Sequence, residues 1–340
     1  MPVSLGYLIQ RLFLTLVVVL GVVTIVFMTT RIIPAHPEFL WVGPHATEEQ
    51  LIKARKELHL DEPIIIQYLY YLKSLLQGDL GVSWRTKNPV LVDIISALPG
   101  TLELAITGFT IGIILGLPLG LLAALNYGGL VDKTLRMVTV SGSAIPVFWA
   151  ALVFQLVLAI KLGLLPGAHR IDPNLVVITG FKPITGFYIL DTLITGRIEL
   201  FIDVIKRLIM PSLVVAMYPM SLTARMARSL ALESLQEDFI RNLRSWGVPS
   251  SVIIRRYILK LIITPIIASL GLSFGYTLVG AFLVEVIFAW NGLGMYIVMA
   301  ILSFDYPAII GGVIVVAIFY CLINTFVDIL HAHIDPRVKL

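Results

Sequence analysis

Few residues in this chain have the type and spacing that chemistry requires. Glu103, Glu285 and Asp328 are the ionisable residues within or beside long apolar runs, where a carboxylate could serve a proton or ion pathway. Each lies near the end of its run, so capping, interfacial solvation or interhelical hydrogen bonding is the favoured role. His331 and His333 are two positions apart and face different directions on a helix, so they do not form a metal pair. No nucleophile, base and orienting residue can be assembled, and we expect neither catalysis nor a metal or cofactor site on this chain.

The most basic stretch of the chain, residues 233–265, lies between two apolar runs. Glu237 and Asp238 precede Arg241 by the three to four residues at which opposite charges face each other on one helix. Gly247 then supplies the left-handed conformation that closes a helix, and the Pro-Ser-Ser that follows starts the next one. The pattern predicts a helical hairpin outside the lipid. Such a hairpin is either a handle for a partner or a merely solvated loop.

Composition decides the broad class. Hydrophobic residues make up 58% of the 340 and charged residues only 14%, whereas soluble proteins are roughly 45–50% apolar. We therefore expect an all-α, polytopic membrane protein in contact with lipid. The single cysteine, Cys321, excludes an internal disulfide. The net charge of +4 is spread over loops and predicts no nucleic-acid partner. The first apolar run is long enough to remain as an anchor rather than a removable signal.

Six apolar runs are long enough to cross a bilayer, which takes roughly 20 residues. These predicted spans are 8–33, 101–125, 137–162, 210–230, 262–288 and 307–330. Pro146 is expected to kink the third. In the second, Gly108, Gly112, Gly116 and Gly120 recur every four residues, which leaves a smooth face that a neighbouring backbone can approach closely.

Polar segments separate the spans and suggest three regions: a first transmembrane helix (1–34), an external helical region (35–99) and a five-helix core (100–340). In the external region, Thr47 and Gln50 form a capping-box pattern and Pro63 opens an amphipathic helix. A short amphipathic piece then leads to Pro99. Within the core, residues 163–206 are rich in proline and glycine and are predicted to form an ordered insert.

Lysine and arginine gather in the short loops at 126–136 and 224–260 and in the two tails. Because membrane orientation follows basic residues in short loops, both termini and the hairpin loop at 231–260 are predicted to be cytoplasmic. Residues 36–98 and 163–206 are then external. We expect a multi-pass protein of the cell (inner or plasma) membrane.

The segment EDFIRNLRSWG, with Pro265 eighteen residues after Gly247, resembles the cytoplasmic EAA loop of permease subunits of binding-protein-dependent ABC importers. The likeness is greatest to the dipeptide and oligopeptide (peptide/nickel) permeases, in the subunit with the long first external region. Further matching stretches cover nearly the whole chain in the expected order, among them LDEPIIIQYLYYLKSLLQGDLGVSWRT, LPGTLEL, AIPVFW, LVEVIFAWNGLG, DYPAIIGG and DPRVKL.

The resemblance implies a type I importer permease fold with six transmembrane helices and no catalytic role. The chain would pair with a second homologous permease subunit and rest on two ATP-binding subunits, which hold the ATP and Mg and perform hydrolysis. An external substrate-binding protein would deliver dipeptides or oligopeptides. The translocation pathway would lie where the second to fifth spans of the two permeases meet.

The resemblance also implies roles for particular residues. A helix over 233–247 would couple to the ATPase, with the candidate residues Glu237, Asp238, Arg241, Arg244, Trp246 and Gly247. Packing or pathway candidates are Gly108, Gly112, Gly116, Pro146, Glu285 and Asn291. Candidates for docking the binding protein are Phe187, Tyr188 and Asp191. Two departures from the family pattern stand out: bulky residues such as Trp246 in the loop predict bulkier groove contacts, and Asn291 in place of a usual proline predicts a less rigid external turn.

Other functions remain open from the residues. The same machinery could import oligosaccharides or nickel. A secondary transporter should show inverted repeats and broken helices with polar groups at mid-membrane, and neither is evident. A purely structural subunit of a membrane complex would have no solute pathway at all.

Overall fold

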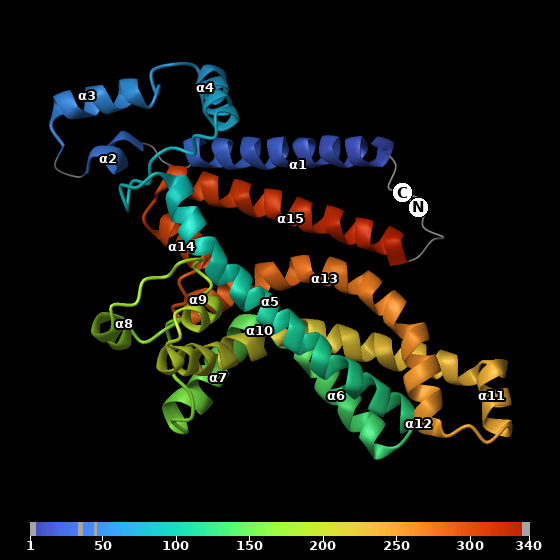
Figure 1. Ribbon diagram of the computed structural model, residues 1–340. Coiled ribbons are helices and arrows are strands. Elements are labelled where there is room, and N and C mark those ends of the chain that lie inside the picture. Colours follow the sequence, from blue (N-terminus) through green and yellow to red (C-terminus); the bar gives the residue numbers. More distant parts are fainter. Residues whose placement is uncertain (1–4, 33–36, 44–45, 335–340) are drawn as a thin grey trace. The chain divides into compact units, whose positions relative to one another are not determined.

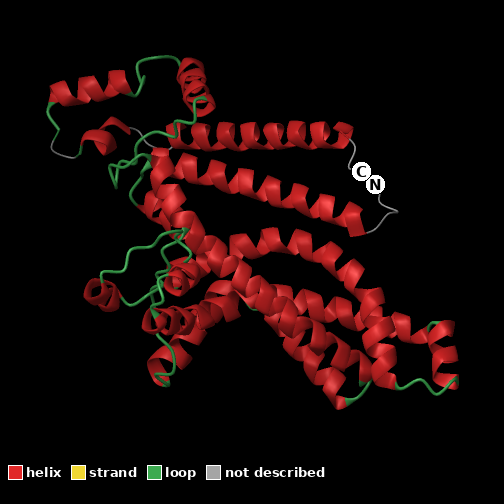
Figure 2. Cartoon of the chain, viewed as in Figure 1, coloured by secondary structure: helices red, strands yellow, loops and turns green. Residues whose placement is uncertain are grey.

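The computed structural model describes residues 5–32, 37–43 and 46–334. Within these residues the regular elements are all helices, and one isolated β-bridge joins Val82 and Pro89 (Figure 2). The all-α prediction is therefore confirmed.

Two compact units make up the chain. Of the described residues, the N-terminal unit contains 5–32, 37–43, 46–98 and 293–322, and the core unit contains 99–292 and 323–334. This division differs from the three predicted regions, because residues 293–322 group with the N-terminal segments.

Five helices lie wholly in the N-terminal unit (Figure 1): α1 (Leu5–Ile32), α2 (Pro37–Val42), α3 (Glu48–Glu57), α4 (Ile64–Leu76) and α14 (Leu293–Leu302). The capping box before α3 is present, with Thr47 and Gln50 each bonding the other's backbone. Pro63 directly precedes α4, as predicted. Val23 of α1 packs with Ile310 and Ile314 from the start of α15 (Tyr306–Ile334), so α1 and this part of α15 lie side by side.

The core unit contains the remaining helices (Figure 1): most of α5 (Val90–Leu125), then α6 (Leu130–Ala144), α7 (Val147–Phe154), α8 (Pro173–Thr179), α9 (Tyr188–Ile194), α10 (Ile198–Gln236), α11 (Asp238–Ser245), α12 (Ser250–Val252) and α13 (Leu259–Ile287), with the end of α15. Short π-helical segments, Gln155–Lys161 and Ile253–Ile258, continue α7 and α12. Helix α10 is central, because α13, α6, α9 and α7 all pack against it.

Four described helices are long and apolar enough to cross a membrane, at Ile9–Thr29, Val90–Leu125, Ser269–Ile287 and Tyr306–Val327. A fifth is obtained if α6 and α7 count as one broken span. The predicted span at 210–230 lies inside α10, which is not among them. Charged residues lie just before that stretch, at Arg207, and within its second half, at Arg225 and Arg228.

Helix α5 starts eleven residues before the predicted span and passes through Pro99 without a break. An internal proline removes one backbone hydrogen bond and normally favours a kink or an end. Here Val90 and Ile94, at the start of the helix, are fully buried in an apolar cluster. Burial of this first part outweighs the local preference, so the expected separate piece before Pro99 is part of α5.

The chain breaks completely at Pro146, where a kink was predicted. Helix α6 ends at Ala144, Ile145 takes an extended conformation, as residues before proline do, and α7 begins at Val147. The two helices enclose an angle of 106°. The position of the bend was predicted correctly and its extent was not.

Candidate functional site

The hairpin predicted from the basic stretch is present in the core unit. Helix α10 ends at Gln236, and Glu237 is extended, with ψ 139°, before α11 begins at Asp238. The predicted helix over 233–247 is therefore two elements: the end of α10 and the short α11. Starting from Ser250, α12 leads through the π-helical segment into α13.

Gly247 closes α11, as its position in the sequence predicted. Its φ is +76°, in the left-handed region. The Gly247 amide donates to the Arg244 carbonyl at 3.0 Å, and the Val248 amide donates to the Leu243 carbonyl at 3.1 Å. This pair of bonds is a Schellman motif. Val248 and Leu243 both pack on the same apolar cluster, which supplies the hydrophobic contact that accompanies the motif.

Helix α11 has one buried face and one exposed face. Ile240 is fully buried in a cluster that also contains Ile253 and Ile258. On the other face the side chains of Asp238 and Arg241 are 92% and 69% exposed and form an ion pair at 3.5 Å, so the predicted pairing with Arg241 is present for Asp238.

The exposed face also carries aromatic rings. Trp246 is 79% exposed, and Arg244 and Glu237 are exposed as well. Phe239, 41% exposed, was not among the predicted residues; its ring lies 6.4 Å from that of Tyr257. An amphipathic reading of α11 alone could have identified it. The face combines charges of both signs with two exposed rings, which suits recognition by another protein.

A buried carboxylate ties α10 to α6 near the hairpin. Arg228 donates to both oxygens of Asp132, at 2.7 and 2.9 Å. Asp132 is 1% exposed and also accepts from the Gly128 amide. This bidentate pair, which the sequence analysis missed, joins residues 96 positions apart and holds the beginning of α6 against the last third of α10.

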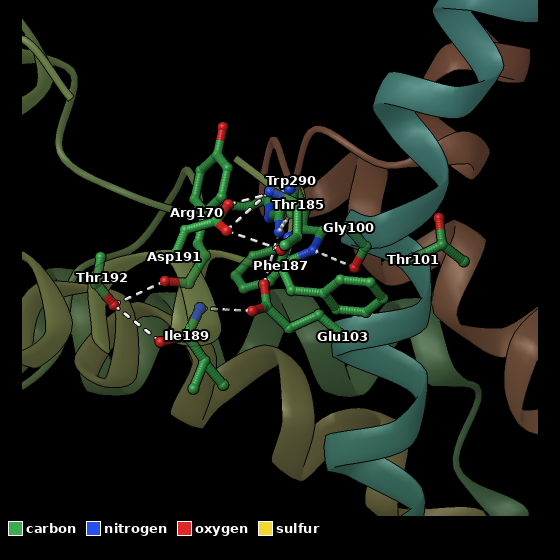
Figure 3. A network of polar contacts seen from close by, with 12 residues as sticks. Gly100, Thr101, Glu103, Arg170, Thr185, Phe187, Ile189, Asp191, Thr192 and Trp290 are labelled. Atoms are coloured by element: carbon green, nitrogen blue, oxygen red, sulfur yellow. Dashed lines mark hydrogen bonds and ion pairs between the residues drawn. The ribbon is translucent and has the colours of Figure 1, made fainter. Parts of the chain in front are cut away.

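A second polar network lies in the insert at 163–206 (Figure 3). The buried Arg170 guanidinium donates to Glu103 Oε2 at 2.6 Å and to the Gly186 carbonyl at 2.8 Å. It also lies 3.8 Å from the centre of the Tyr188 ring, within cation–π range. Glu103 Oε1 accepts from the Ile189 amide at 2.8 Å. The structural role favoured for Glu103 is thus the one observed, and its partner Arg170 was missed because the two are 67 residues apart.

The three candidates for docking the binding protein lie in or beside the same network. Asp191 is 0% exposed and accepts from the Thr185 amide, the Thr185 hydroxyl and the Gly186 amide (Figure 3). It orders the loop before α9 and is not available to a docking protein, so its prediction as a contact residue was wrong. Phe187 and Tyr188 are half-buried. Tyr188 packs between Arg170 and Phe181.

The turn after α13 is held by Trp290. Its indole N–H donates to the Gly100 carbonyl at 2.9 Å, and its ring is fully buried. Glu285 is also fully buried and accepts from the Thr101 hydroxyl at 2.5 Å. Asn291 is exposed. Beside Asn291, the hydrogen bond of Trp290 connects the turn to α5.

The glycine face of α5 is covered by α10 of the same chain. A Cβ added at Gly108 would lie 2.6 Å from Val215, and one at Gly116 would lie 2.6 Å from the Met220 carbonyl. A Cβ added at Gly112 would lie 2.7 Å from the Pro219 ring. The predicted close helix approach is confirmed. Of the two roles predicted for these glycines, packing inside the chain is the one observed.

The fold and hairpin together define a class: an α-helical, multi-pass membrane protein that presents a rigid charged hairpin outside its apolar spans. Residues 116–340 match the family model "Binding-protein-dependent transport system inner membrane component", and residues 4–105 match the model of the N-terminal part of such membrane components. The chain belongs to this family, and it is a membrane-spanning permease subunit of an ABC importer. The family decides against a secondary transporter and against a purely structural subunit.

Similar proteins span almost the whole chain. The Probable D,D-dipeptide transport system permease protein DdpB of Escherichia coli K12 is 38% identical over 97% of this chain and 96% of that protein. The dipeptide transport system permease protein DppB of Alkalihalophilus pseudofirmus is 37% identical over 98% and 99%. Among solved structures, an inward-facing conformation of the MetNI methionine ABC transporter matches with a TM-score of 0.52 over 72% of this chain and 97% of that chain, at 13% identity. That likeness shows the fold, a type I importer permease.

Proposed function

We propose that this chain forms half of the translocation pathway for dipeptides or oligopeptides, together with a second homologous permease subunit. An external substrate-binding protein delivers the cargo, and two ATP-binding subunits supply the energy. The names of the similar proteins favour peptides over oligosaccharides or nickel. The chain resides in the inner or plasma membrane with both termini in the cytoplasm.

The observation that carries this proposal is the geometry of α11. A helix that merely crossed a solvated loop would need neither a closed Schellman turn nor a fully buried anchor. Ile240 fixes α11 to the core unit, and the exposed face presents Glu237, Asp238, Arg241, Arg244 and Trp246 in one rigid frame. We assign this face to the groove of an ATP-binding subunit.

Helix α10 connects this face to the insert. Its 39 residues correspond to roughly 58 Å of α-helix. Near its start, Arg207 pairs with Asp172 and Asp203 at 2.9 Å, and towards its end Arg228 pairs with Asp132. ATP binding in the partners would bias the equilibrium between outward-open and inward-open states, and a hairpin built on α10 transmits that bias to the helices packed against it.

Site-directed cross-linking tests the contact. In a Cys321→Ala background, a cysteine replacing Arg241 should cross-link to a cysteine in the groove of the ATP-binding subunit. The matched control, a cysteine replacing the exposed Lys182 in the insert, should not. Cross-linking at both positions, or at Lys182 alone, contradicts the assignment.

The same two cysteine variants test orientation. A membrane-impermeant thiol reagent should reach Arg241→Cys from the cytoplasmic side only and Lys182→Cys from outside only. Cargo is tested by ATP-driven uptake of a labelled dipeptide into proteoliposomes that contain the whole complex, with an oligosaccharide and nickel as competitors. Uptake that nickel or the oligosaccharide suppresses, and that excess dipeptide leaves unchanged, would exclude peptides as the cargo.

A further inference from the structure

A cavity of about 460 Å³ lies in the N-terminal unit. Its wall includes Phe27 of α1, the turn after α3 with His59, the face of α4 that carries Gln67 and Tyr71, and Tyr306 at the start of α15. All lining residues belong to this one unit. The volume lies within the roughly 300–1,000 Å³ typical of small-molecule sites.

Polar atoms without partners are concentrated on this wall. In the described part of the chain, eight buried side-chain nitrogen or oxygen atoms have no hydrogen-bond partner, and four of them line this cavity. They are Gln67 Oε1, Tyr71 Oη, Trp84 Nε1 and Tyr306 Oη. Trp84 and Tyr306 are only 9% and 8% exposed. Because buried polar groups are normally hydrogen-bonded, four such groups around one cavity indicate that something polar completes them.

Aromatic rings form much of the wall. Phe27 and Tyr71 stack with their centres 5.7 Å apart, and Tyr306 meets Trp84 edge-on at 5.1 Å. Ring faces attract ammonium groups, and rings combined with acceptor oxygens form the cages that bind them. Two carboxylates, Glu57 and Asp79, also line the cavity. These features favour a positively charged amine.

Donors on the same wall favour a second, anionic group. The Trp84 indole N–H can only donate, and Lys73 adds a cationic ammonium. Burial raises the pKa of the Tyr71 hydroxyl above its usual value, so this group stays protonated and can donate as well as accept. The ligand that best matches the whole wall therefore carries both an ammonium group and an anion.

We propose that this cavity binds a small zwitterion, with its primary ammonium against the aromatic rings, Gln67 and the carboxylates, and its anionic group on Trp84 Nε1 and Lys73. Two sources share this chemistry. One is a short free peptide, which would make the cavity an accessory cargo site and rests on the proposed function. The other is the headgroup of phosphatidylethanolamine. One end of each of two apolar spans contributes to the cavity wall, with Phe27 near the end of Ile9–Thr29 and Tyr306 at the start of Tyr306–Val327. Lipid headgroups lie at the ends of membrane spans.

Binding is measured on the full chain, purified with the subunits that accompany it and without the binding protein. The peptide arm uses labelled dialanine and equilibrium dialysis in nanodiscs of phosphatidylglycerol. The lipid arm uses native mass spectrometry to count phosphatidylethanolamine molecules retained from nanodiscs that contain equal amounts of phosphatidylethanolamine and phosphatidylglycerol. Retention of either probe at one site per chain supports the proposal and identifies the source.

Variants locate the site. Trp84→Phe and Tyr306→Phe each keep a ring and delete one unpartnered polar atom, and each should weaken binding by roughly two- to tenfold. Tyr296→Phe is the matched control, because Tyr296 carries an equally buried unpartnered hydroxyl in the same unit but does not line the cavity. It should leave binding unchanged.

The proposal is overturned if neither probe is retained. It is also overturned if Trp84→Phe and Tyr306→Phe bind the retained probe as well as the unmodified chain does. In that case water alone satisfies the unpartnered polar atoms. Dipeptide uptake is measured in parallel. If the complex does not transport dipeptides, the proposed function fails, but phosphatidylethanolamine bound in the cavity would still support the present proposal. The two proposals can therefore be refuted separately.

Discussion

Replacing Gly247 with valine tests the coupling role of the hairpin most directly. At φ +76° the residue is in the left-handed region, and a Cβ built there meets no atom within 4 Å. The substitution therefore creates no clash, and its cost is that of the backbone alone. For a residue with a Cβ that cost is about 1 kcal/mol, and for a β-branched one about 2 kcal/mol. The closed turn then becomes roughly 5- to 30-fold less favourable.

This penalty acts on the end of α11 and not on the membrane core. We expect Gly247→Val to insert normally and to fail at the hairpin in one of two ways. Either the ATP-binding subunits associate more weakly, by up to the same factor, or the complex hydrolyses ATP without stimulation by loaded binding protein. The assay is ATPase activity and uptake by the reconstituted complex, with co-purification of the ATP-binding subunits.

Three variants calibrate the result. Gly247→Ala should give about half the effect, and Gly247→Asn less still, because asparagine tolerates the left-handed conformation. Gly180→Val is the positional control: Gly180 ends α8 at φ +60° with equally open surroundings. It should carry the same local penalty in the insert and leave ATPase coupling intact. Full coupling in Gly247→Val would mean that this turn is incidental to energy transfer.

Three further predictions concern the core unit. Arg170→Met leaves the buried Glu103 without its ion-pair partner and should lower the free energy of unfolding by about 3–5 kcal/mol, measured by thermal unfolding in detergent. Adding Glu103→Leu to the same chain should restore part of this loss. If the effects of the two substitutions are purely additive, the ion pair does not contribute as argued. Gly116→Ala should separate α5 from α10 and reduce folded yield, whereas Gly280→Ala, with no neighbour within 4 Å, should be neutral or slightly stabilising; equal yields would contradict the packing. Trp290→Phe removes the donor to a carbonyl of α5 and should destabilise by about 1–3 kcal/mol, and an unchanged melting temperature would show that the turn is held by other contacts.

Local signals in the sequence were sufficient for the elements that depend on neighbouring residues. Glycine at 247 predicted the left-handed end of α11, and Thr47 with Gln50 predicted the capping box of α3. Pro146 marked the break between α6 and α7. In each case the deciding interaction spans at most six residues. The family and the membrane class also followed from the sequence, because composition and ordered motifs need no three-dimensional contact.

Tertiary structure decided what distant residues do. The helical continuation through Pro99 depends on burial of Val90 and Ile94 against α14 and the start of α15, which the sequence near the proline does not record. Asp191 is a charged residue of the kind expected at an exposed docking surface, yet its carboxylate is buried and accepts three hydrogen bonds from Thr185 and Gly186 within the insert.

The pairing of charges shows most clearly which features follow from local sequence and which depend on the tertiary structure. Sequence alone identified Glu103 as an ionisable residue beside an apolar run and favoured a structural role for it. Its partner Arg170 could not be identified, because many arginines are compatible with one glutamate until the chain folds. A pair 67 residues apart is selected by the packing of α5 against the insert, where each charge is stable only in contact with the other. Patterns within a few residues thus determined where helices begin, end and turn, whereas which faces are covered and which charges meet depended on long-range burial.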